Sequence, residues 1–100
     1  MDMDNTKEVL NRANEIMDNW KTKMKSGSRG EIIERGLINE NVAYEITLLK
    51  GIGETNFWGI ILIEEINGKL DYFKGIGTYF NFEHGVKQYV KDFKELYGDK

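Results

Sequence analysis

Cysteine and proline are both absent from this chain of 100 residues. Without cysteine there is no disulfide, no thiolate nucleophile and no cysteine-ligated zinc site. Without proline there is no proline-rich docking motif, so glycine and asparagine must supply the turns. Long apolar runs are missing too, since the longest, residues 57–63, is far too short to span a bilayer. The acidic start, Met1-Asp2-Met3-Asp4, is unlike a signal peptide, so we expect a cytoplasmic protein with no membrane contact.

Basic residues are outnumbered by acidic ones, and histidine is scarce. The formal net charge is −3, from 14 Lys and Arg against 17 Asp and Glu, which disfavours nucleic acid as a general partner. His84 is the single histidine, so a histidine metal cluster is excluded. A general base needs a partner and a pocket, and a lone histidine in the first turn of a helix is more often a solvated surface group. The segment from Lys21 to Lys25 lies beside Trp20, as in some nucleic-acid contacts. Trp20 belongs to an apolar helical stripe, however, so we expect these lysines to complement the negative end of a helix.

Length and composition predict one folded domain. One hundred residues, 40% of them hydrophobic and 31% charged, suit a single globular unit that spans residues 1–100 without a linker. The many β-branched and aromatic residues argue against disorder.

Two helices are predicted, one toward each end of the chain. The first apolar stripe consists of Val9, Leu10, Ala13, Ile16, Met17, Trp20 and Met24. It follows Asn5 as the expected N-cap and should end near residues 26–28, Ser-Gly-Ser. The second stripe consists of Val86, Tyr89, Val90, Phe93, Leu96 and Tyr97. It follows Asn81 as the expected N-cap and should run to about Gly98.

Between the helices the apolar period changes to two, which predicts a four-stranded antiparallel meander. The expected strands are residues 31–38, 42–49 and 57–66 and a fourth strand that starts at Lys69. Residues 39–41 form the first expected turn, which places Arg35 opposite Glu45. The fold class is therefore α+β, with an N-terminal helix, a four-stranded antiparallel β-meander and a C-terminal helix.

The dipeptide Asn67-Gly68 is a strong two-residue hairpin signal and predicts which residues meet across the last two strands. On one face the pairs are Glu64 with Asp71, Leu62 with Phe73, Ile60 with Gly75 and Trp58 with Gly77. On the other face they are Glu65 with Leu70, Ile63 with Tyr72 and Ile61 with Lys74. Gly75 and Gly77 then either lie beneath bulky cross-strand neighbours or mark a bulge after Lys74.

A Lys-Gly-Ile-Gly pattern occurs twice, at residues 50–53 and 74–77. Neither copy has the third glycine of a dinucleotide fingerprint or the Gly-Lys-Ser/Thr ending of a phosphate loop, so no cofactor is expected. The N–H groups of Gly51, Ile52 and Gly53 still offer an alternative function, a small-ligand or nucleotide sensor with an anion nest.

Carboxylates gather near the predicted hairpin tip, where Glu64, Glu65 and Asp71 lie close together. Such a group can raise a pKa or hold a divalent cation. Strand tips usually project into water, where acidic residues improve solubility and limit edge pairing, so we expect no metal site. No nucleophile and base occur together elsewhere, which argues against an enzyme.

The middle hairpin carries apolar residues on both faces. Helices that flank a meander usually pack on one side, so we expect both on one sheet face and the other face bare, whereas helices divided between the faces would remove the patch. The expected partner-binding residues are Trp58, Ile60, Leu62 and Phe73, with Glu64 and Asp71 as an acidic rim. The sequence thus predicts a small acidic protein-binding module, either a homodimer or a blocker of a partner protein. Small phage-encoded inhibitors and immunity proteins are analogous in size and charge.

Overall fold

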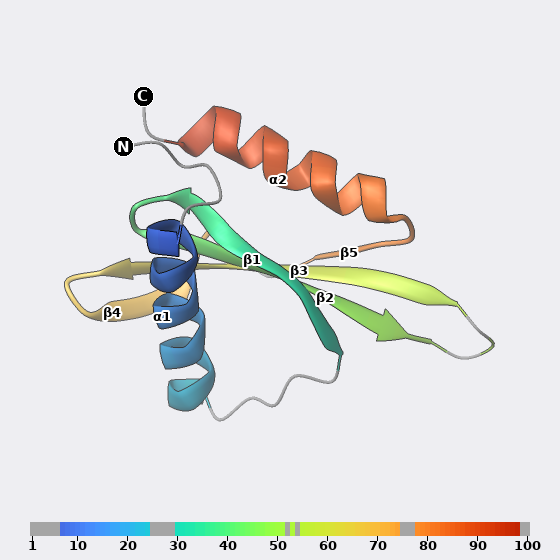
Figure 1. Cartoon of the computed structure of the whole chain (residues 1–100), viewed down its shortest axis with the longest axis horizontal. Helices are drawn as coiled ribbons and strands as arrows, with labels where there is room; N and C mark the ends of the chain where they lie inside the picture. The colour runs from blue at the N-terminus through green and yellow to red at the C-terminus, as the bar shows by residue number, and fades with distance from the viewer. Residues whose placement is uncertain (1–6, 25–29, 52, 54, 75–77, 99–100) are drawn as a thin grey trace.

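The computed structural model describes residues 7–24, 30–51, 53, 55–74 and 78–98. Helices α1 (Lys7–Met24) and α2 (Glu83–Tyr97) enclose the sheet in the chain order. The strands are β1 (Glu31–Asn39), β2 (Val42–Lys50), β3 (Asn56–Ile66), β4 (Lys69–Tyr72) and β5 (Thr78–Phe80). All pairs are antiparallel; β1, β2 and β3 are neighbours in that order, and β4 and β5 both pair with the remaining edge of β3 (Figure 1). The predicted α+β class is confirmed.

The Asn67-Gly68 turn forms as expected. Both residues have positive φ, 53° and 80°, as a type I′ turn requires. From this turn β3 and β4 pair in the predicted register, including Glu64 with Asp71 and Ile63 with Tyr72. The first hairpin also has the predicted Arg35–Glu45 pair.

The predicted fourth strand is divided in two, which changes the register beyond Phe73. Lys74 has φ of 59°, so the backbone leaves strand geometry there, and residues 75–77 lie outside the described residues. Pairing resumes in β5, with Ile60 opposite Thr78 and Trp58 opposite Phe80. The predicted pairs Ile60–Gly75, Trp58–Gly77 and Ile61–Lys74 are therefore wrong, and the alternative of a bulge after Lys74 falls outside the described residues.

The two helices pack on opposite faces of the sheet, and the expectation of a shared face is wrong. The α1 cluster consists of Val9, Ala13, Ile16, Met17, Trp20, Leu37, Ala43 and Ile63. The α2 cluster consists of Ile38, Val42, Tyr44, Ile46, Ile60, Leu62, Val86 and Val90. Successive strand residues such as Leu37 and Ile38, or Leu62 and Ile63, point to opposite faces and are all buried. The central strands therefore need cover on both faces, and each helix supplies one cover (Figure 1).

The helix ends differ from the prediction at one cap. Helix α2 begins after Phe82, with no side-chain hydrogen bond at the cap, so Asn81 as N-cap is wrong. It ends at Gly98, whose N–H donates to the Lys94 carbonyl, as expected. The expected cap at Asn5 and the stop at residues 26–28 lie outside the described residues. Along α1 the stripe is buried except for Leu10, which is exposed, and the Met24 side chain is not described.

Candidate binding surface

The four predicted partner-binding apolar residues lie beneath α2. Ile60 and Leu62 are buried, and Trp58 and Phe73 are partly buried against the same cluster. The Phe73 ring contacts those of Phe93 and Tyr97 on α2, at 6.4 and 5.2 Å between centroids. These side chains are therefore part of the core and do not form a bare sheet face.

The acidic residues of the hairpin tip are divided between the two faces. Glu64 and the exposed Asp71 pair across β3 and β4, beside an open pocket of about 460 Å³ at the tip. Glu65 points to the other face and forms an ion pair with Arg12 at 2.9 Å. Within the described ranges, no three His, Cys, Asp or Glu residues gather in a way that could hold a metal ion.

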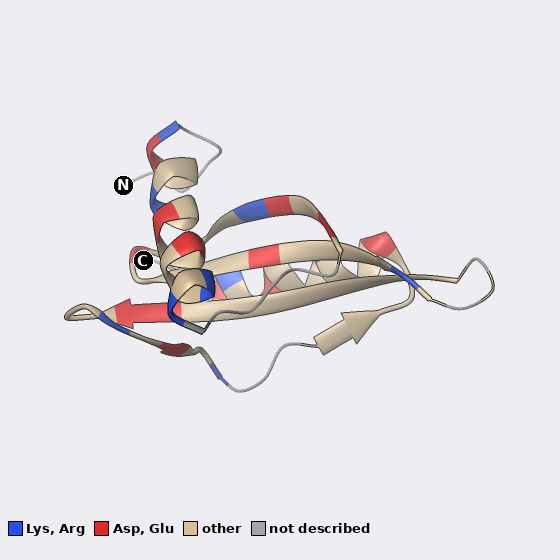
Figure 2. Ribbon diagram, turned by 90° about the horizontal axis from the view of Figure 1, so that it is seen from below, with Lys and Arg blue, Asp and Glu red and all other residues tan. Residues whose placement is uncertain are grey.

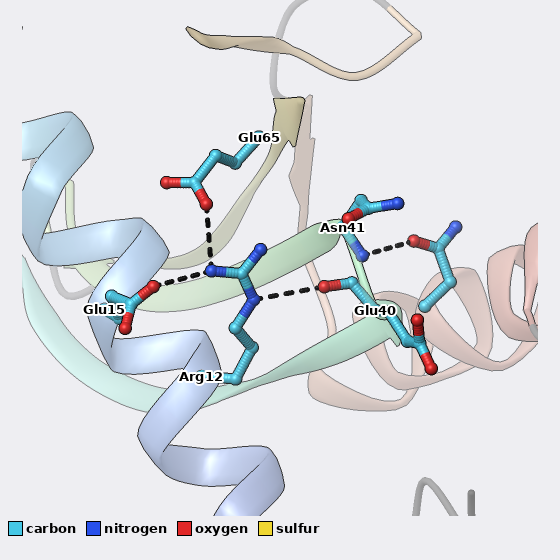
Figure 3. A network of polar contacts seen from close by, with 6 residues as sticks. Arg12, Glu15, Glu40, Asn41 and Glu65 are labelled. Carbon is cyan, nitrogen blue, oxygen red and sulfur yellow. Dashed lines mark hydrogen bonds and ion pairs between the residues drawn. The ribbon is translucent and has the colours of Figure 1, made fainter. Parts of the chain in front are cut away.

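Arg12 fastens the first half of α1 to the sheet. Its Nη1 lies 2.6 Å from Glu15 Oε1 and 2.9 Å from Glu65 Oε1, and its Nε donates to the Glu40 carbonyl at 3.1 Å (Figure 3). Asn41, next to Glu40, accepts through its carbonyl the N–H of Glu65. A single guanidinium thus joins α1 to the β1–β2 turn and to β3.

A second ionic cluster fastens the other half of α1. The Glu45 side chain is only 3% exposed; its Oε2 accepts a hydrogen bond from Arg35 Nε at 2.8 Å and forms an ion pair with Arg35 Nη2, also at 2.8 Å. Lys21 Nζ lies 2.9 Å from Glu45 Oε1, and Arg35 Nη1 reaches Asp18 and Asn14 on α1. Burial alone would lower the pKa of Arg35, but the bonds to Glu45 and Asp18 outweigh it and raise that pKa. Lys21 is thus an anchor of α1 to the sheet, and Lys23 is exposed beside it.

Among the described residues, α1 covers only the part of its sheet face that lies next to these anchors. Along each strand, residues that point to the α1 face alternate with residues that point to the α2 face. On the α1 face, the first set of cross-strand neighbours beyond the Arg35–Glu45 pair forms a row across four strands. That row consists of Ile32, Thr47, Gly59 and Tyr79. The next row pairs Leu49 with Phe57. We call these six residues the open half-face; Figure 2 looks onto this side, where α1 crosses the strands at one end only.

The open half-face is apolar and carries no charged residue. Tyr79 is 67% exposed and Ile32 is 44% exposed, whereas Thr47, Leu49 and Phe57 are partly buried. The Tyr79 ring lies over Gly59, where a Cβ atom would come within 3.3 Å of it. A bulky cross-strand neighbour over a glycine is the arrangement that we expected at Gly75, beneath Ile60, and at Gly77, beneath Trp58. The pairing of Gly59 with Tyr79 could not be predicted from the Asn67-Gly68 turn, because the register of β5 differs from that of β4.

A pocket lies on the opposite face of β5 from the open half-face, between β5 and α2. It is open, has a volume of about 470 Å³ and is lined by Phe80, His84, Gly85, Gln88, Tyr89 and Asp92. The Phe80 and Tyr89 rings lie 5.4 Å apart, and Gln88 Nε2 donates to Asp92 Oδ1 at 2.8 Å. Burial raises the pKa of Tyr89, so its hydroxyl stays protonated. We call this the β5–α2 pocket; sequence reasoning identified only His84 of its members.

His84 itself is exposed at the start of α2. Its ring stacks on Phe82, with centroids 5.5 Å apart and planes at 19°, and Phe82 is 65% exposed. Two exposed rings therefore extend the aromatic surface from the β5–α2 pocket to the start of the helix.

The alternative glycine loop is only partly described. The Gly51 N–H donates to the Thr55 carbonyl at 2.7 Å, so it is already engaged within the loop. Gly53 has φ of 73°, and Ile52 lies outside the described residues.

A third polar cluster lies between β1 and α2. Glu34 accepts hydrogen bonds from the buried Tyr44 hydroxyl at 2.6 Å and from Lys87. Partial burial raises the pKa of Glu34, but these two bonds and the nearby lysine charges outweigh it and lower that pKa. Burial, together with the bond to Glu34, raises the pKa of Tyr44 well above its ordinary value. Because Glu34 on β1 bonds both Tyr44 on β2 and Lys87 on α2, this cluster helps to hold α2 against the sheet.

Comparison with protein-family models, curated proteins and solved structures gave no match to this chain. Among the described residues, no helix is long and apolar enough to cross a membrane.

Proposed function

We propose that the protein is a cytoplasmic, non-enzymatic binding module that captures an apolar segment of a partner protein on its open half-face. The observation that carries the proposal is the uncharged row from Ile32 to Tyr79, which crosses four strands beyond the cover of α1.

The chemistry of the open half-face supports binding over catalysis. Its only titratable group is the exposed Tyr79 hydroxyl, so within these six residues there is no nucleophile paired with a base. Tyr is enriched at energetically important interface positions, and its ring here lies against the backbone of Gly59. A partly ordered aromatic residue loses less conformational freedom on binding than a flexible one.

The ion pairs beside the open half-face hold α1 in its position on the sheet. Glu45, Arg35 and Lys21 hold α1 over the row next to Thr47, and a sliding helix would have to break these buried contacts. Separating a buried charge from its partner is strongly unfavourable, so α1 is not expected to close over Tyr79.

The test compares two apolar residues of matched exposure. Tyr79, at 67% exposed, lies on the open half-face, and Leu96, at 64% exposed, lies on α2. Immobilised wild type, Tyr79→Ser and Leu96→Ser are used to capture proteins from lysates of the cells that encode the chain, with quantification by mass spectrometry. We expect one protein to be retained equally by wild type and Leu96→Ser, and at least about tenfold less by Tyr79→Ser.

Two outcomes would contradict the proposal. Equal retention by Tyr79→Ser and wild type would remove the open half-face from the interface. Sedimentation that finds a wild-type dimer which Tyr79→Ser dissociates would replace the foreign partner with a second copy of this chain.

A further inference from the structure

The β5–α2 pocket combines aromatic rings with an unneutralised carboxylate. Phe80 and Tyr89 form one wall, with ring centroids 5.4 Å apart, and Asp92 lies in the same lining. Among the residues of the lining that the structure describes, Asp92 is the only carboxylate and neither Lys nor Arg is present. The pocket therefore has negative charge beside π-faces, which is the environment that favours an organic cation.

The polar side chains of the pocket include two possible acceptors. Gln88 Nε2 donates to Asp92 Oδ1 at 2.8 Å, which orients both side chains. Within the described part of the chain, this bond leaves Gln88 Oε1 and Asp92 Oδ2 available as acceptors. A planar group with several N–H donors and an apolar face matches two acceptors next to aromatic rings.

We propose that the β5–α2 pocket binds the guanidinium group of an arginine side chain on the partner protein. The guanidinium stacks against Phe80 and Tyr89 and donates to Asp92 and Gln88. Lysine fits this site less well, because its ammonium is a compact, strongly hydrated charge that neither stacks nor donates in a planar fork. The assignment of the arginine to a protein rests on the proposed function: Phe80 and Tyr79 are successive residues of the edge strand β5 and point to opposite faces, so a partner bound on the open half-face reaches the pocket by crossing this edge.

The same charges argue against a second copy as the source of the arginine. A symmetric dimer uses one surface on both subunits, so that surface must be complementary to itself. Among the described residues of the open half-face and the β5–α2 pocket there is a carboxylate but no Lys or Arg. A foreign partner with a basic residue next to an apolar segment supplies what this surface lacks.

The test titrates the folded protein with small probes and follows amide and side-chain NMR signals. The probe is N-acetyl-arginine-N-methylamide, compared with the citrulline analogue, which is nearly isosteric but uncharged, and with the lysine analogue. We expect saturable shifts at Phe80, Gln88 and Tyr89 with an affinity on the order of millimolar, weaker binding of lysine and none of citrulline. Asp92→Asn should weaken arginine binding about tenfold, and the matched control Glu95→Gln, an exposed carboxylate on the same helix, should not change it.

Each other result overturns the inference. No saturable shift, equal binding of citrulline, or equal affinity in Asp92→Asn would show that the pocket does not recognise a guanidinium. Tighter binding of agmatine, a free guanidinium compound, than of the arginine probe would assign the pocket to a small cation and remove the protein source. The proposed function fails separately. If Tyr79→Ser still captures the partner while the arginine probe binds the pocket, partner binding by the open half-face is contradicted and guanidinium binding by the pocket is supported. If the arginine probe does not bind while Tyr79→Ser loses the partner, guanidinium binding is contradicted and partner binding by the open half-face is supported.

Discussion

Arg35→Met is expected to lower the free energy of unfolding by about 3–5 kcal/mol, because it leaves a buried carboxylate without its main partner. Glu45 is 3% exposed and has a hydrogen bond and an ion pair with Arg35, both at 2.8 Å, and one ion pair of 2.9 Å with Lys21. The substitution removes both Arg35 contacts and also frees Asp18 on α1. Since small domains have free energies of unfolding of about 5–15 kcal/mol, the urea midpoint should fall markedly.

The double variant Arg35→Met, Glu45→Leu is the matched control. It removes the buried charge together with its partner, and apolar replacement of a buried ion pair is often neutral or stabilising. Lys21 is 20% exposed and can turn toward water when Glu45 is gone. We expect the double variant to be more stable than Arg35→Met, with a coupling energy of at least about 2 kcal/mol in urea unfolding followed by circular dichroism. Additive effects, or an unchanged Arg35→Met, would refute the anchoring of α1 by this cluster.

Three further predictions test the fold. Trp20→Ala, on the α1 face, and Ile60→Ala, on the α2 face, should each cost about 2–5 kcal/mol, because both side chains are at most 5% exposed; an unchanged thermal midpoint for either would contradict the two-sided core. Gly68→Val should cost about 1–3 kcal/mol, because φ there is 80°, and chemical shifts without a turn at that position would count against the hairpin. Tyr44 has a raised pKa, so the unfolded chain loses this proton first and stability falls as the pH rises above about 10; Tyr44→Phe should show a smaller fall, and identical slopes would contradict this role.

The sequence predicted the elements well because their signals are local. Asn67-Gly68 requires positive φ at two successive residues, and this geometry sets the register of the next four pairs without outside help. The same reasoning failed beyond Phe73, because the left-handed conformation of Lys74 interrupts the ladder; Gly75 and Gly77 allowed a bulge there but did not indicate by how many residues the register would change. Tyr79 therefore took its place over Gly59 without a sequence clue.

The placement of the helices was a different kind of error. Buried neighbours such as Leu37 with Ile38 indicate strands that need cover on both faces, and this signal was present in the sequence. The general tendency of flanking helices to share a face was given more weight. This error changed the site. The sheet face that we expected to be bare is the core beneath α2, and the exposed apolar residues lie instead on the α1 face, at the end that α1 does not cover. The β5–α2 pocket depends on contacts between residues of β5 and α2, which no local pattern reveals.

The most direct test of the open half-face uses a photo-reactive side chain at one position. Tyr79→benzoylphenylalanine places the reactive group on the open half-face, and Leu96→benzoylphenylalanine places it at a similarly exposed position on α2. After irradiation in the cells that encode the chain, the account predicts a covalent adduct with one partner protein from position 79 and none from position 96. No adduct from position 79, or the same adducts from both positions, would contradict the claim that this protein binds a partner through its open half-face.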